Sequence, residues 1–431
     1  MACRLDEYQR RDVTAPSSAS LLREIHSLVE LFYASFITLG SYACWGLVSV
    51  SVFEHFTKRW CPEEPHAALR LLAGLGGMAS AEAGLDMWRL AAAAHQDPVV
   101  EAAVLATGDF AATRARLAAM ANGAAFLARW DAFMLRHGHH ARGEIELMNV
   151  RWADDPDYVL GQVRIYLRNI DGKDPVAAQG AQAADSRRLA EAIRRRLRNP
   201  LSRALFNFLL RRSQHGILYR ENVKSEAVRL AALARRNALE IGQRAAARGI
   251  LERRDDVFFL GFDEIGDAID ADGAGPARPR RRDLRALVAQ RRAAFEHDRS
   301  TEPPGVVVGH FDGATNTAGQ PDGRHECLTG FGVSPGVVSG PARVILRADV
   351  DERVLPGEIL VAPFTDPGWT PYFQLAAGLV TDLGGSLSHG SIIAREYGLP
   401  AVVNVGHATR LIRTGDRLHV DGTRGEVRIL R

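Results

Sequence analysis

The sequence predicts a multidomain protein of the α plus α/β type, with a large, mostly α-helical N-terminal part and a smaller C-terminal part. From about residue 20 to residue 265 the chain is rich in alanine, leucine and arginine at helical spacing. After Cys327, short β-branched segments alternate with glycine and proline, as in strands joined by tight turns. A chain of 431 residues with 46% hydrophobic content has enough apolar material for two or three domains.

We expect four segments along the chain. Residues 1–20 form an N-terminal tail, and residues 21–266 form the helical domain. Residues 267–325 carry runs of glycine and proline around one arginine-rich helix, a composition typical of a hinge or linker. Residues 326–431 form the C-terminal domain, and its last two strands, on either side of Gly422, are expected to pair as a β-meander.

Charge and cysteine content exclude several classes of protein. The net charge of +3 is small, and basic residues alternate with acidic ones, so no nucleic-acid partner is expected. The four cysteines form no Cys-x-x-Cys pair, which argues against a zinc site or a disulfide framework and favours a reducing cytoplasm. The N-terminus shows no signal-peptide pattern, which also favours a cytoplasmic protein.

One apolar segment, residues 31–53, has nearly the length needed to cross a membrane. It contains no charged side chain, but serine, threonine and glycine interrupt it repeatedly. We therefore expect a buried helix or helix pair there, and no membrane partner.

The most informative local pattern surrounds a single histidine. An apolar run that ends at Val380 predicts a buried strand, and the pair Gly384-Gly385 allows a sharp turn. Ser388 is then the expected N-cap of a short helix whose first turn contains His389.

The start of a helix favours anions. Unpaired N–H groups and the positive end of the helix dipole meet there, and they bias an imidazole toward its neutral, nucleophilic form. A phosphoryl group on a nitrogen of His389 would be stabilised by the same donors. The alternative is that His389 only caps the helix and the glycines only turn the chain.

The longer pattern Gly-Gly-x-x-Ser-His-x-x-Ile-x-Ala-Arg-Glu-x-Gly-x-Pro-Ala-Val closely resembles the phosphohistidine, or swivelling, domain of the phosphoenolpyruvate-utilising enzymes. That group contains phosphoenolpyruvate synthase, pyruvate phosphate dikinase and rifampicin phosphotransferase. The similarity extends over residues 332–345, 355–363, 365–371 and 420–427. It implies a swivelling β/β/α domain in which His389 is phosphorylated. It also implies phosphate-binding or supporting roles for Thr381, Gly384, Gly385, Ser388 and Arg395.

Two basic residues in the helical part have a spacing that suits phosphate. Arg220 and Lys224 lie four apart on one predicted helix face, where two donors can clamp an anionic group. The alternative is an exposed basic face with Glu221 and Glu226 as partners. The pair resembles the substrate-domain helix of rifampicin phosphotransferase, which implies a place at the phosphoryl-transfer site.

A histidine-rich loop forms a second cluster. His137, His139, His140 and Glu144 include possible metal ligands, but they crowd a glycine-broken loop without helical i, i+4 geometry, so no metal is expected. The loop resembles a Gly-His-x-x-x-Gly-Glu segment of the same helical substrate domain. That resemblance implies that His139 and Glu144 line the acceptor pocket or brace it.

No glycine-rich loop or paired carboxylates of an ATP-grasp domain are evident, and there is no room for a phosphoenolpyruvate-binding barrel. The resemblance therefore implies half of a split phosphotransferase. A separate ATP-grasp protein would use Mg²⁺ and ATP to load His389, which would pass the phosphoryl group to a hydroxyl or carboxylate of a small-molecule acceptor. No tightly bound cofactor is expected. The alternatives are a condensing enzyme or ligase component of natural-product biosynthesis, and a non-catalytic phosphocarrier or ligand-binding protein.

Overall fold

The computed structural model describes residues 2–64, 66–270, 283–299, 327–347 and 354–430. Helices fill the N-terminal part, and strands occur only after residue 326 in the described ranges, which confirms the predicted fold class. By its internal contacts the chain divides into two compact units. Unit 1 contains residues 1–34, 145–149 and 227–322, and unit 2 contains residues 35–144, 150–226 and 323–431.

The helices of the N-terminal part are α1 (Ala2–Arg10), α2 (Ser18–Trp60), α3 (Ala67–Leu71), α4 (Ala79–His95), α5 (Pro98–Leu105), α6 (Phe110–Ala118), α7 (Gly123–His137), α8 (Pro156–Arg168), α9 (Pro175–Arg196), α10 (Pro200–Ala247), η1 (Arg254–Phe259), α11 (Phe262–Asp270) and α12 (Leu284–Arg299). Three of them begin with a proline that follows an aspartate N-cap. The carboxylates of Asp97, Asp155 and Asp174 accept hydrogen bonds from N–H groups in the first turns of α5, α8 and α9. These sequences therefore set where the helices begin.

Unit 1 is built around the outer ends of two long helices, α2 and α10. Leu21 and Ile25 of α2 share a core with Leu230 of α10 and with α11 and α12. Leu5 of α1 is buried in the same core. The segment expected to be an N-terminal tail thus contains a packed helix, because α1 presents an apolar side chain that the sequence pattern did not single out.

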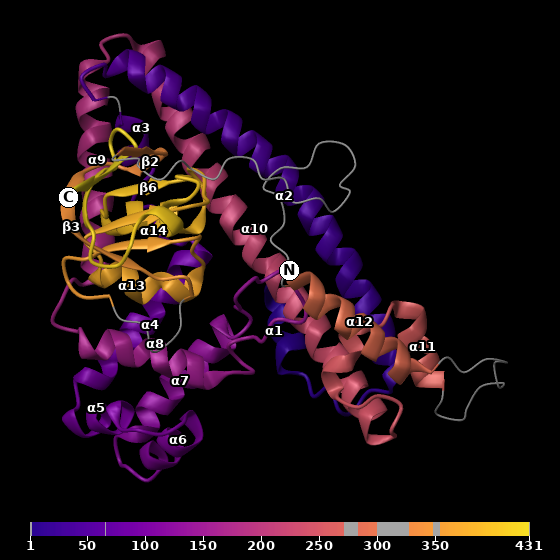
Figure 1. Ribbon diagram of the computed structural model, residues 1–431. Helices are drawn as coiled ribbons and strands as arrows, with labels where there is room; N and C mark the ends of the chain where they lie inside the picture. Colours follow the sequence, from indigo (N-terminus) through magenta and orange to yellow (C-terminus); the bar gives the residue numbers. More distant parts are fainter. Residues whose placement is uncertain (1, 65, 271–282, 300–326, 348–353, 431) are drawn as a thin grey trace. The chain divides into compact units, whose positions relative to one another are not determined.

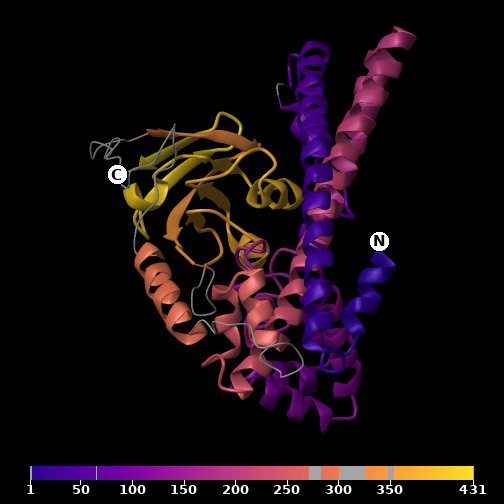
Figure 2. The ribbon, with the colours of Figure 1, turned by 90° about the vertical axis from the view of Figure 1, so that its right-hand side faces the viewer.

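The predicted helical domain, residues 21–266, is shared between the two units, because α2 and α10 contribute residues to both. Figure 2 shows both as long, uninterrupted helices. The arginine-rich helix predicted for the hinge is present as α12. The rest of that hinge prediction falls largely on residues 271–282 and 300–326, which lie outside the described residues.

In unit 2, the remaining parts of α2 and α10 pack against each other in antiparallel directions. Gly46 and Gly216 allow a close approach, since a Cβ atom on Gly216 would lie 3.1 Å from the Cα of Gly46. The Ser213 hydroxyl donates to the carbonyl of Ser49 over 3.1 Å. A separate core around the buried Trp130 joins α4, α5, α7 and α8.

The prediction of a buried helix or helix pair over residues 31–53 is wrong about burial. The segment is part of one continuous helix, α2, but most of it is exposed. Only 12% of its most apolar window is buried, and Ile37, Trp45 and Val48 are among its exposed side chains. By length and composition alone, α2 meets the criterion for a membrane span, a criterion that core helices and signal sequences also meet. The apolar sequence predicts a helix of apolar composition, but whether that helix is buried depends on which other element packs against it.

The C-terminal part of unit 2 is one sheet with helices on both faces. Its strands are β1 (Cys327–Thr329), β2 (Phe331–Ser334), β3 (Val337–Val344), β4 (Ile359–Ala362), β5 (Gly378–Thr381), β6 (Ala401–Val403), β7 (Arg417–Asp421) and β8 (Glu426–Leu430). The order across the sheet is β1-β8-β7-β3-β4-β5-β6-β2. Strands β3 to β6 run parallel to one another, and the outer strands pair antiparallel. The pairing of β7 with β8 confirms the predicted β-meander.

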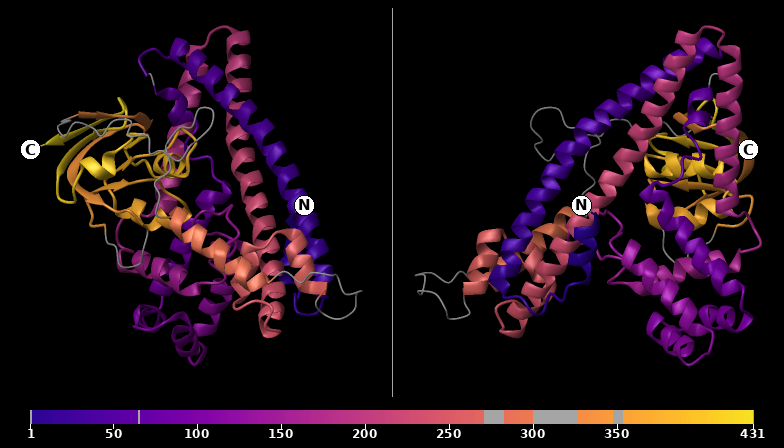
Figure 3. Two further views of the ribbon diagram at one scale, coloured as in Figure 1. Left: turned by 45° about the vertical axis from the view of Figure 1, so that its right-hand side comes forward. Right: turned by 180° about the vertical axis from the view of Figure 1, so that it is seen from behind.

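Alternate residues of the central strands face two different cores. Leu360 and Leu379 pack with the helices α13 (Thr370–Leu375) and α14 (His389–Tyr397). Val361 and Val380 pack on the other side with α15 (Ala408–Leu411). Such two-sided burial is typical of parallel strands and explains their continuous apolar sequences. Figures 1 and 3 show the sheet with α13 and α14 beside it.

Candidate functional site

The predicted strand, turn and helix around His389 are confirmed. Strand β5 is buried throughout and ends at Thr381. Gly384 has a φ of 154°, a backbone conformation that favours glycine. Ser388 is the N-cap of α14, and His389 is the first residue of that helix.

Hydrogen bonds hold the turn in place. The Thr381 hydroxyl donates to the carbonyl of Leu383 over 2.9 Å. The hydroxyl oxygens of Ser388 and Ser391 lie 2.9 Å apart, and Ser391 also donates to the carbonyl of Gly385 over 2.7 Å. The Ser388 side chain therefore fixes the turn and does not cap a backbone N–H of the helix. Four of the predicted phosphate-binding positions, including Gly384, thus surround the start of α14.

The imidazole of His389 is buried, and its pKa is lowered, so the ring is neutral at pH 7. Both ring nitrogens are shielded from solvent, and neither has a hydrogen-bond partner among the described residues. Burial, and next the positive charge of Lys224, lower the pKa of His389 to about 3. The ring therefore carries a lone pair at neutral pH, and both nitrogens are buried without a hydrogen-bond partner among the described residues, which is uncommon for polar atoms in a folded protein.

The helical part of unit 2 supplies a cation and a carboxylate to the same site. Lys224 Nζ of α10 lies 3.2 Å from Glu144 Oε2, and Glu144 Oε1 lies 2.6 Å from Nδ1 of His140. Burial alone would raise the pKa of Glu144, but the hydrogen bond and charge of His140, followed by Lys224, lower it to about 2. Glu144 is thus a buried carboxylate that contacts both His140 and Lys224.

Arg220 connects α10 to the turn that precedes His389. Its guanidinium donates to the carbonyl of Leu387 over 3.0 Å and also pairs with Glu221. Glu221 is buried and accepts a hydrogen bond of 2.8 Å from the Ser80 hydroxyl. The two residues of the predicted pair therefore have different partners. Arg220 contacts the turn before His389, whereas Lys224 contacts Glu144.

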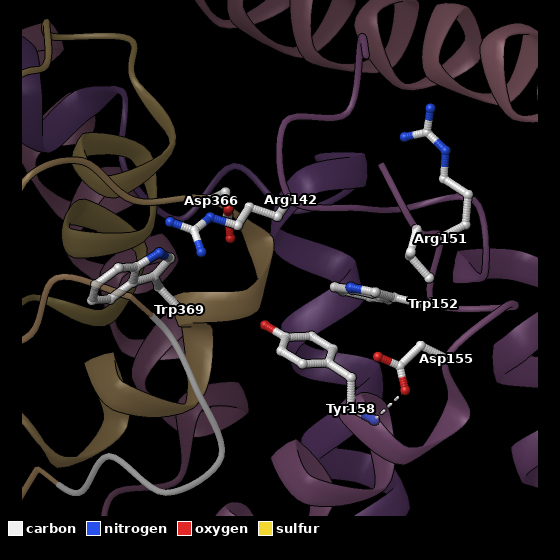
Figure 4. Close-up of a pocket in the computed structure, with 8 residues that line it drawn as sticks. Arg142, Arg151, Trp152, Asp155, Tyr158, Asp366 and Trp369 are labelled. Atoms are coloured by element: carbon white, nitrogen blue, oxygen red, sulfur yellow. Dashed lines mark hydrogen bonds between the residues drawn. The ribbon is translucent and has the colours of Figure 1, made fainter. Parts of the chain in front are cut away.

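A cavity of about 180 Å³ is lined by residues from both the helical part and the C-terminal part of unit 2. Its walls include Arg142, Trp152 and Tyr158 from the former, and Asp366 and Trp369 from the latter. Figure 4 shows the Arg142 side chain extending toward Asp366. Tyr158 lies so close to Gly368 that a Cβ atom there would be 2.0 Å from its hydroxyl oxygen, so the two parts fit closely.

Two carboxyl groups that influence each other, Asp366 and Glu144, have pKa values shifted in opposite directions. Burial first, and then the negative charge of Glu144, raise the pKa of Asp366 to about 6, although a hydrogen bond from the Gly368 N–H opposes the shift. Glu144 stays ionised. Separated carboxyl pKa values of this kind are common where acid–base or electrostatic chemistry takes place.

Two further predicted residues, Arg395 and His139, have partners other than His389. Arg395 comes six residues later on α14, about 9 Å along the helix axis, and donates to the carbonyl of Val333 over 3.2 Å. His139 is buried against His140, with 4.3 Å between ring centroids. Arg395 is thus part of the packing between α14 and β2, whereas the His139 ring packs against His140.

The sequence interpretation assigned no role to His140 beyond possible metal binding, and it named no role for Asp366. Within the described ranges, no group of three or more histidine, cysteine, aspartate or glutamate side chains is placed to hold a metal ion. Asp366 lies in residues 365–371, a segment that carried the family resemblance and was the available signal. The sequence showed that His140 and Glu144 are four residues apart. It did not show that the His140 ring faces the Glu144 carboxylate.

The fold and the site together combine a sheet-containing part that carries His389 with a helical part that supplies Arg220 and Lys224. Residues 354–425 match the family described as PEP-utilising enzyme, mobile domain, and residues 40–221 match the family described as Rifampicin phosphotransferase fourth domain. The chain therefore combines a domain of the rifampicin phosphotransferases with the mobile domain of the phosphoenolpyruvate-utilising enzymes. This confirms the resemblance inferred from the sequence.

Curated relatives show the same relationship. The chain is 37% identical to a rifampicin phosphotransferase of Streptomyces sviceus over 310 residues, which cover 70% of this chain and 34% of the relative. It is 31% identical to the rifampicin phosphotransferase of Bacillus cereus over 320 residues, with the same coverage. It is 35% identical to the prodigiosin synthesizing transferase PigC of Serratia marcescens over 323 residues, 70% of this chain and 33% of the relative. The chain thus spans about a third of the length of these relatives.

Proposed function

We propose that this protein is a phosphotransferase component in which His389 carries a phosphoryl group to a small-molecule acceptor held by the helical part. The observation that supports this most directly is the His389 ring itself. Its nitrogens are shielded and without a hydrogen-bond partner among the described residues, and its electrostatic environment includes Lys224 and Glu144. A nucleophile kept neutral beside a fixed cation suits the formation and transfer of a phosphohistidine.

Each residue has a defined part in the proposed reaction. His389 acts first as the nucleophile that receives the phosphoryl group and then as the leaving group. Lys224, held by Glu144, stabilises negative charge on the transferring phosphoryl oxygens, and Arg220 fixes the turn before His389. A fixed cation of this kind contributes about 10²-fold or more to phosphoryl or acyl transfer when it contacts the developing charge.

We further propose that a separate ATP-grasp protein loads His389 from ATP and Mg²⁺. In support, the relatives named rifampicin phosphotransferase extend well beyond the third of their length that this chain matches. We place the reaction in the cytoplasm, where ATP is available and where free thiols such as the exposed Cys44 and Cys327 stay reduced.

The acceptor that the surface favours is bulky and apolar. Next to Arg220, the ring of Tyr219 packs on Tyr42 of α2, with 4.3 Å between centroids, and Trp45 is 63% exposed. We propose that this face of α2 and α10 holds an aromatic or polycyclic acceptor and not a lipid bilayer. Two of the relatives are named for rifampicin and a third for prodigiosin.

A second function is favoured by the relative named for prodigiosin synthesis, at 35% identity. In that case the phosphoryl group would activate an acceptor carboxylate, and the net reaction would be a condensation. The two functions share the loading of His389 and differ in the fate of the phosphorylated acceptor.

The test is the intact mass of the protein, measured under alkaline conditions that preserve a phosphohistidine. The chain is incubated with Mg-ATP alone, with Mg-ATP and a lysate of its host, and then with rifampicin as a first acceptor probe. We expect one added phosphoryl group that requires the lysate and is absent from His389→Ala. If an independently active lysate adds no phosphoryl group to the wild-type chain, the carrier role is wrong.

A further inference from the structure

Arg395 of α14 is a buried arginine that forms no ion pair with a carboxylate in the described part of the chain. The residue is only 5% exposed, and its guanidinium donates one hydrogen bond, to the carbonyl of Val333 over 3.2 Å. An arginine has five N–H donors, so most of this guanidinium is left without an acceptor among the described residues. A buried charge in this state is costly unless a partner neutralises it.

The guanidinium of Arg395 is charged at neutral pH. Burial lowers its pKa to about 10, although the negative charges of Glu396 and Glu221 oppose the shift. Both of these carboxylates have other partners. Glu396 accepts a hydrogen bond from the Gln179 amide over 2.9 Å, and Glu221 pairs with Arg220. The fold therefore buries one positive charge beside carboxylates that are engaged elsewhere.

Arg395 lines a cavity of about 190 Å³ in unit 2. The polar residues of its lining are Arg70, Gln182 and Asp185 from the helical part, and Ser334 and Arg395 from the C-terminal part. This cavity shares no described lining residue with the cavity beside Asp366. The space is large enough for a molecule of several non-hydrogen atoms. An arginine with unused donors therefore borders a space that a small ligand can enter.

The second arginine of the cavity is already neutralised. Nε and Nη2 of Arg70 donate to the two carboxylate oxygens of Asp185 over 3.0 Å and 3.1 Å, and Nη1 pairs with Glu64. Of the two arginines, Arg395 is thus the one with positive charge to offer a ligand. The carboxylate of Asp185 in the same wall disfavours a ligand that carries two negative charges. The cavity therefore suits an anion with a single charge.

The shapes of the available donors suit a carboxylate. A guanidinium binds a planar carboxylate through two parallel N–H···O bonds. The side-chain amide of Gln182 on α9 can supply a further donor, and it reaches the end of α14, since a Cβ atom on Gly398 would lie 2.4 Å from its Nε2. A phosphate monoester fits less well, because it carries about −1.5 to −2 charges at pH 7.

We propose that this cavity is a binding site for a small organic monocarboxylate, which pairs with the guanidinium of Arg395 and accepts a hydrogen bond from the amide of Gln182. The ligand contacts α9 of the helical part and α14 of the C-terminal part together. Its binding therefore stabilises the contact between these two parts of unit 2. The site is separate from the cavity beside Asp366, and the proposal does not depend on phosphoryl transfer by His389.

The test measures the binding of acetate to the full chain by isothermal titration calorimetry and by thermal unfolding, at constant ionic strength. Acetamide has the shape of acetate without its charge, and methyl phosphate carries more charge, so these two are the comparison probes. We expect one acetate per chain and binding of either comparison probe that is at least about 10-fold weaker. The unfolding temperature should rise with the concentration of acetate.

Arg395→Met removes the charge and keeps a long apolar side chain. It should weaken the binding of acetate at least about 10-fold, because a hydrogen bond to a charged group is lost. The matched control is Arg195→Met, which removes an exposed arginine that pairs with Glu191 and should bind acetate like the wild type. Gln182→Ala is a second variant that leaves the buried charge in place, and it should weaken binding about 2- to 10-fold. Circular dichroism establishes that the variants are folded.

Four results would overturn the proposal. They are a wild type that binds no acetate, equal affinity for acetate in the wild type and in Arg395→Met, binding of acetamide as tight as that of acetate, and tighter binding of methyl phosphate than of acetate. If Arg395→Met does not fold, Gln182→Ala decides the matter. Weaker binding in that variant supports the site, and unchanged binding overturns it.

Discussion

The two halves of the site are built in opposite ways. The C-terminal half is a continuous strand, turn and helix, in which Thr381, Ser388 and His389 lie close together in sequence. The helical half brings together Glu144 and Lys224, which come from a loop and from a distant helix. The first half positions its histidine through local backbone geometry, whereas the second requires two elements of unit 2 to pack correctly.

This difference indicates which substitutions should disturb each half of the site. A local motif keeps its geometry as long as the turn forms, so it responds to changes in glycine and capping residues. A site assembled from distant segments depends on ion pairs and on close contacts between helices, so single changes there should disturb transfer without disturbing the loading of His389.

The largest effect is expected from Lys224→Met, which removes the cation of the helical half and leaves the C-terminal motif intact. Transfer from phospho-His389 to an acceptor should fall by about 10²- to 10³-fold, because a charge-stabilising group is lost from the transition state. Loading of His389 by phosphoramidate should be unchanged. Single-turnover ³¹P NMR measures both.

Lys58→Met is the matched control, since Lys58 pairs with Glu54 on an exposed helix face. It should leave transfer unchanged. An equal loss of loading and of transfer in Lys224→Met would mean that the halves do not act separately.

Gly84→Ala should weaken the contact between the halves without touching either set of polar groups. A Cβ atom at Gly84 of α4 would lie 2.1 Å from Cγ2 of Thr370, which is fully buried and cannot move aside easily. Overpacking of this kind costs about 1–3 kcal/mol, equivalent to roughly a 5- to 150-fold loss of the docked arrangement. Hydrogen exchange of α13 and the transfer rate provide the measurements.

Gly180→Ala serves as the control for Gly84→Ala, because no atom of the described residues lies within 4 Å of a Cβ atom placed at Gly180. It should leave both measurements unchanged. Wild-type transfer rates in Gly84→Ala would show that the contact at Thr370 does not support the site.

The two carboxyl groups should give opposite dependences of stability on pH. The folded-state pKa of Glu144, about 2, lies below its ordinary value of 4.5, so its stabilising contribution is complete above pH 4.5 and is lost between pH 4.5 and 2. The full contribution corresponds to about 3 kcal/mol at one pKa unit per 1.36 kcal/mol. Urea unfolding at several pH values should show the wild type losing its advantage over Glu144→Gln across that window. A constant difference between the two proteins would contradict the assigned ionisation.

Asp366 should behave in the reverse sense, because its folded-state pKa of about 6 lies above its ordinary value of 3.8. Its ionised form is disfavoured in the folded protein, so the cost is absent below pH 3.8 and complete above pH 6. Asp366→Asn should therefore raise the unfolding temperature at pH 8 and change it little at pH 4. An unfolding temperature that falls at pH 8 would mean that the ionised carboxylate stabilises the fold.

The smallest effect on stability is expected at Trp45. Because it is exposed on α2, Trp45→Ser should change the free energy of unfolding by less than about 0.5 kcal/mol. The same change should weaken binding of the apolar dye 8-anilinonaphthalene-1-sulfonate to this face. Trp130→Ala, in the buried core, should by contrast cost about 3–5 kcal/mol. A large loss of stability in Trp45→Ser would show that this face is covered.

The sequence was a reliable guide where structure is local. The buried strand before Thr381, the N-cap at Ser388 and the end of α14 at Gly398 all result from residue types at fixed offsets. It was a poorer guide to burial. The apolar part of α2 looked like a core helix but is mostly exposed, because burial depends on neighbours far away in sequence.

By itself, the sequence determined the class of fold, the phosphohistidine motif and the residue types available for phosphate chemistry. These depend on short-range propensities and on a motif contained in one stretch of chain. Only the tertiary structure decided that Arg220 contacts the turn while Lys224 pairs with Glu144, and that Arg395 packs against β2. It also decided that Nε2 of His140 is buried without a hydrogen-bond partner in the described part of the chain. Each of these facts depends on which distant side chain meets which, and side-chain pairing across the fold is fixed by packing and not by local sequence.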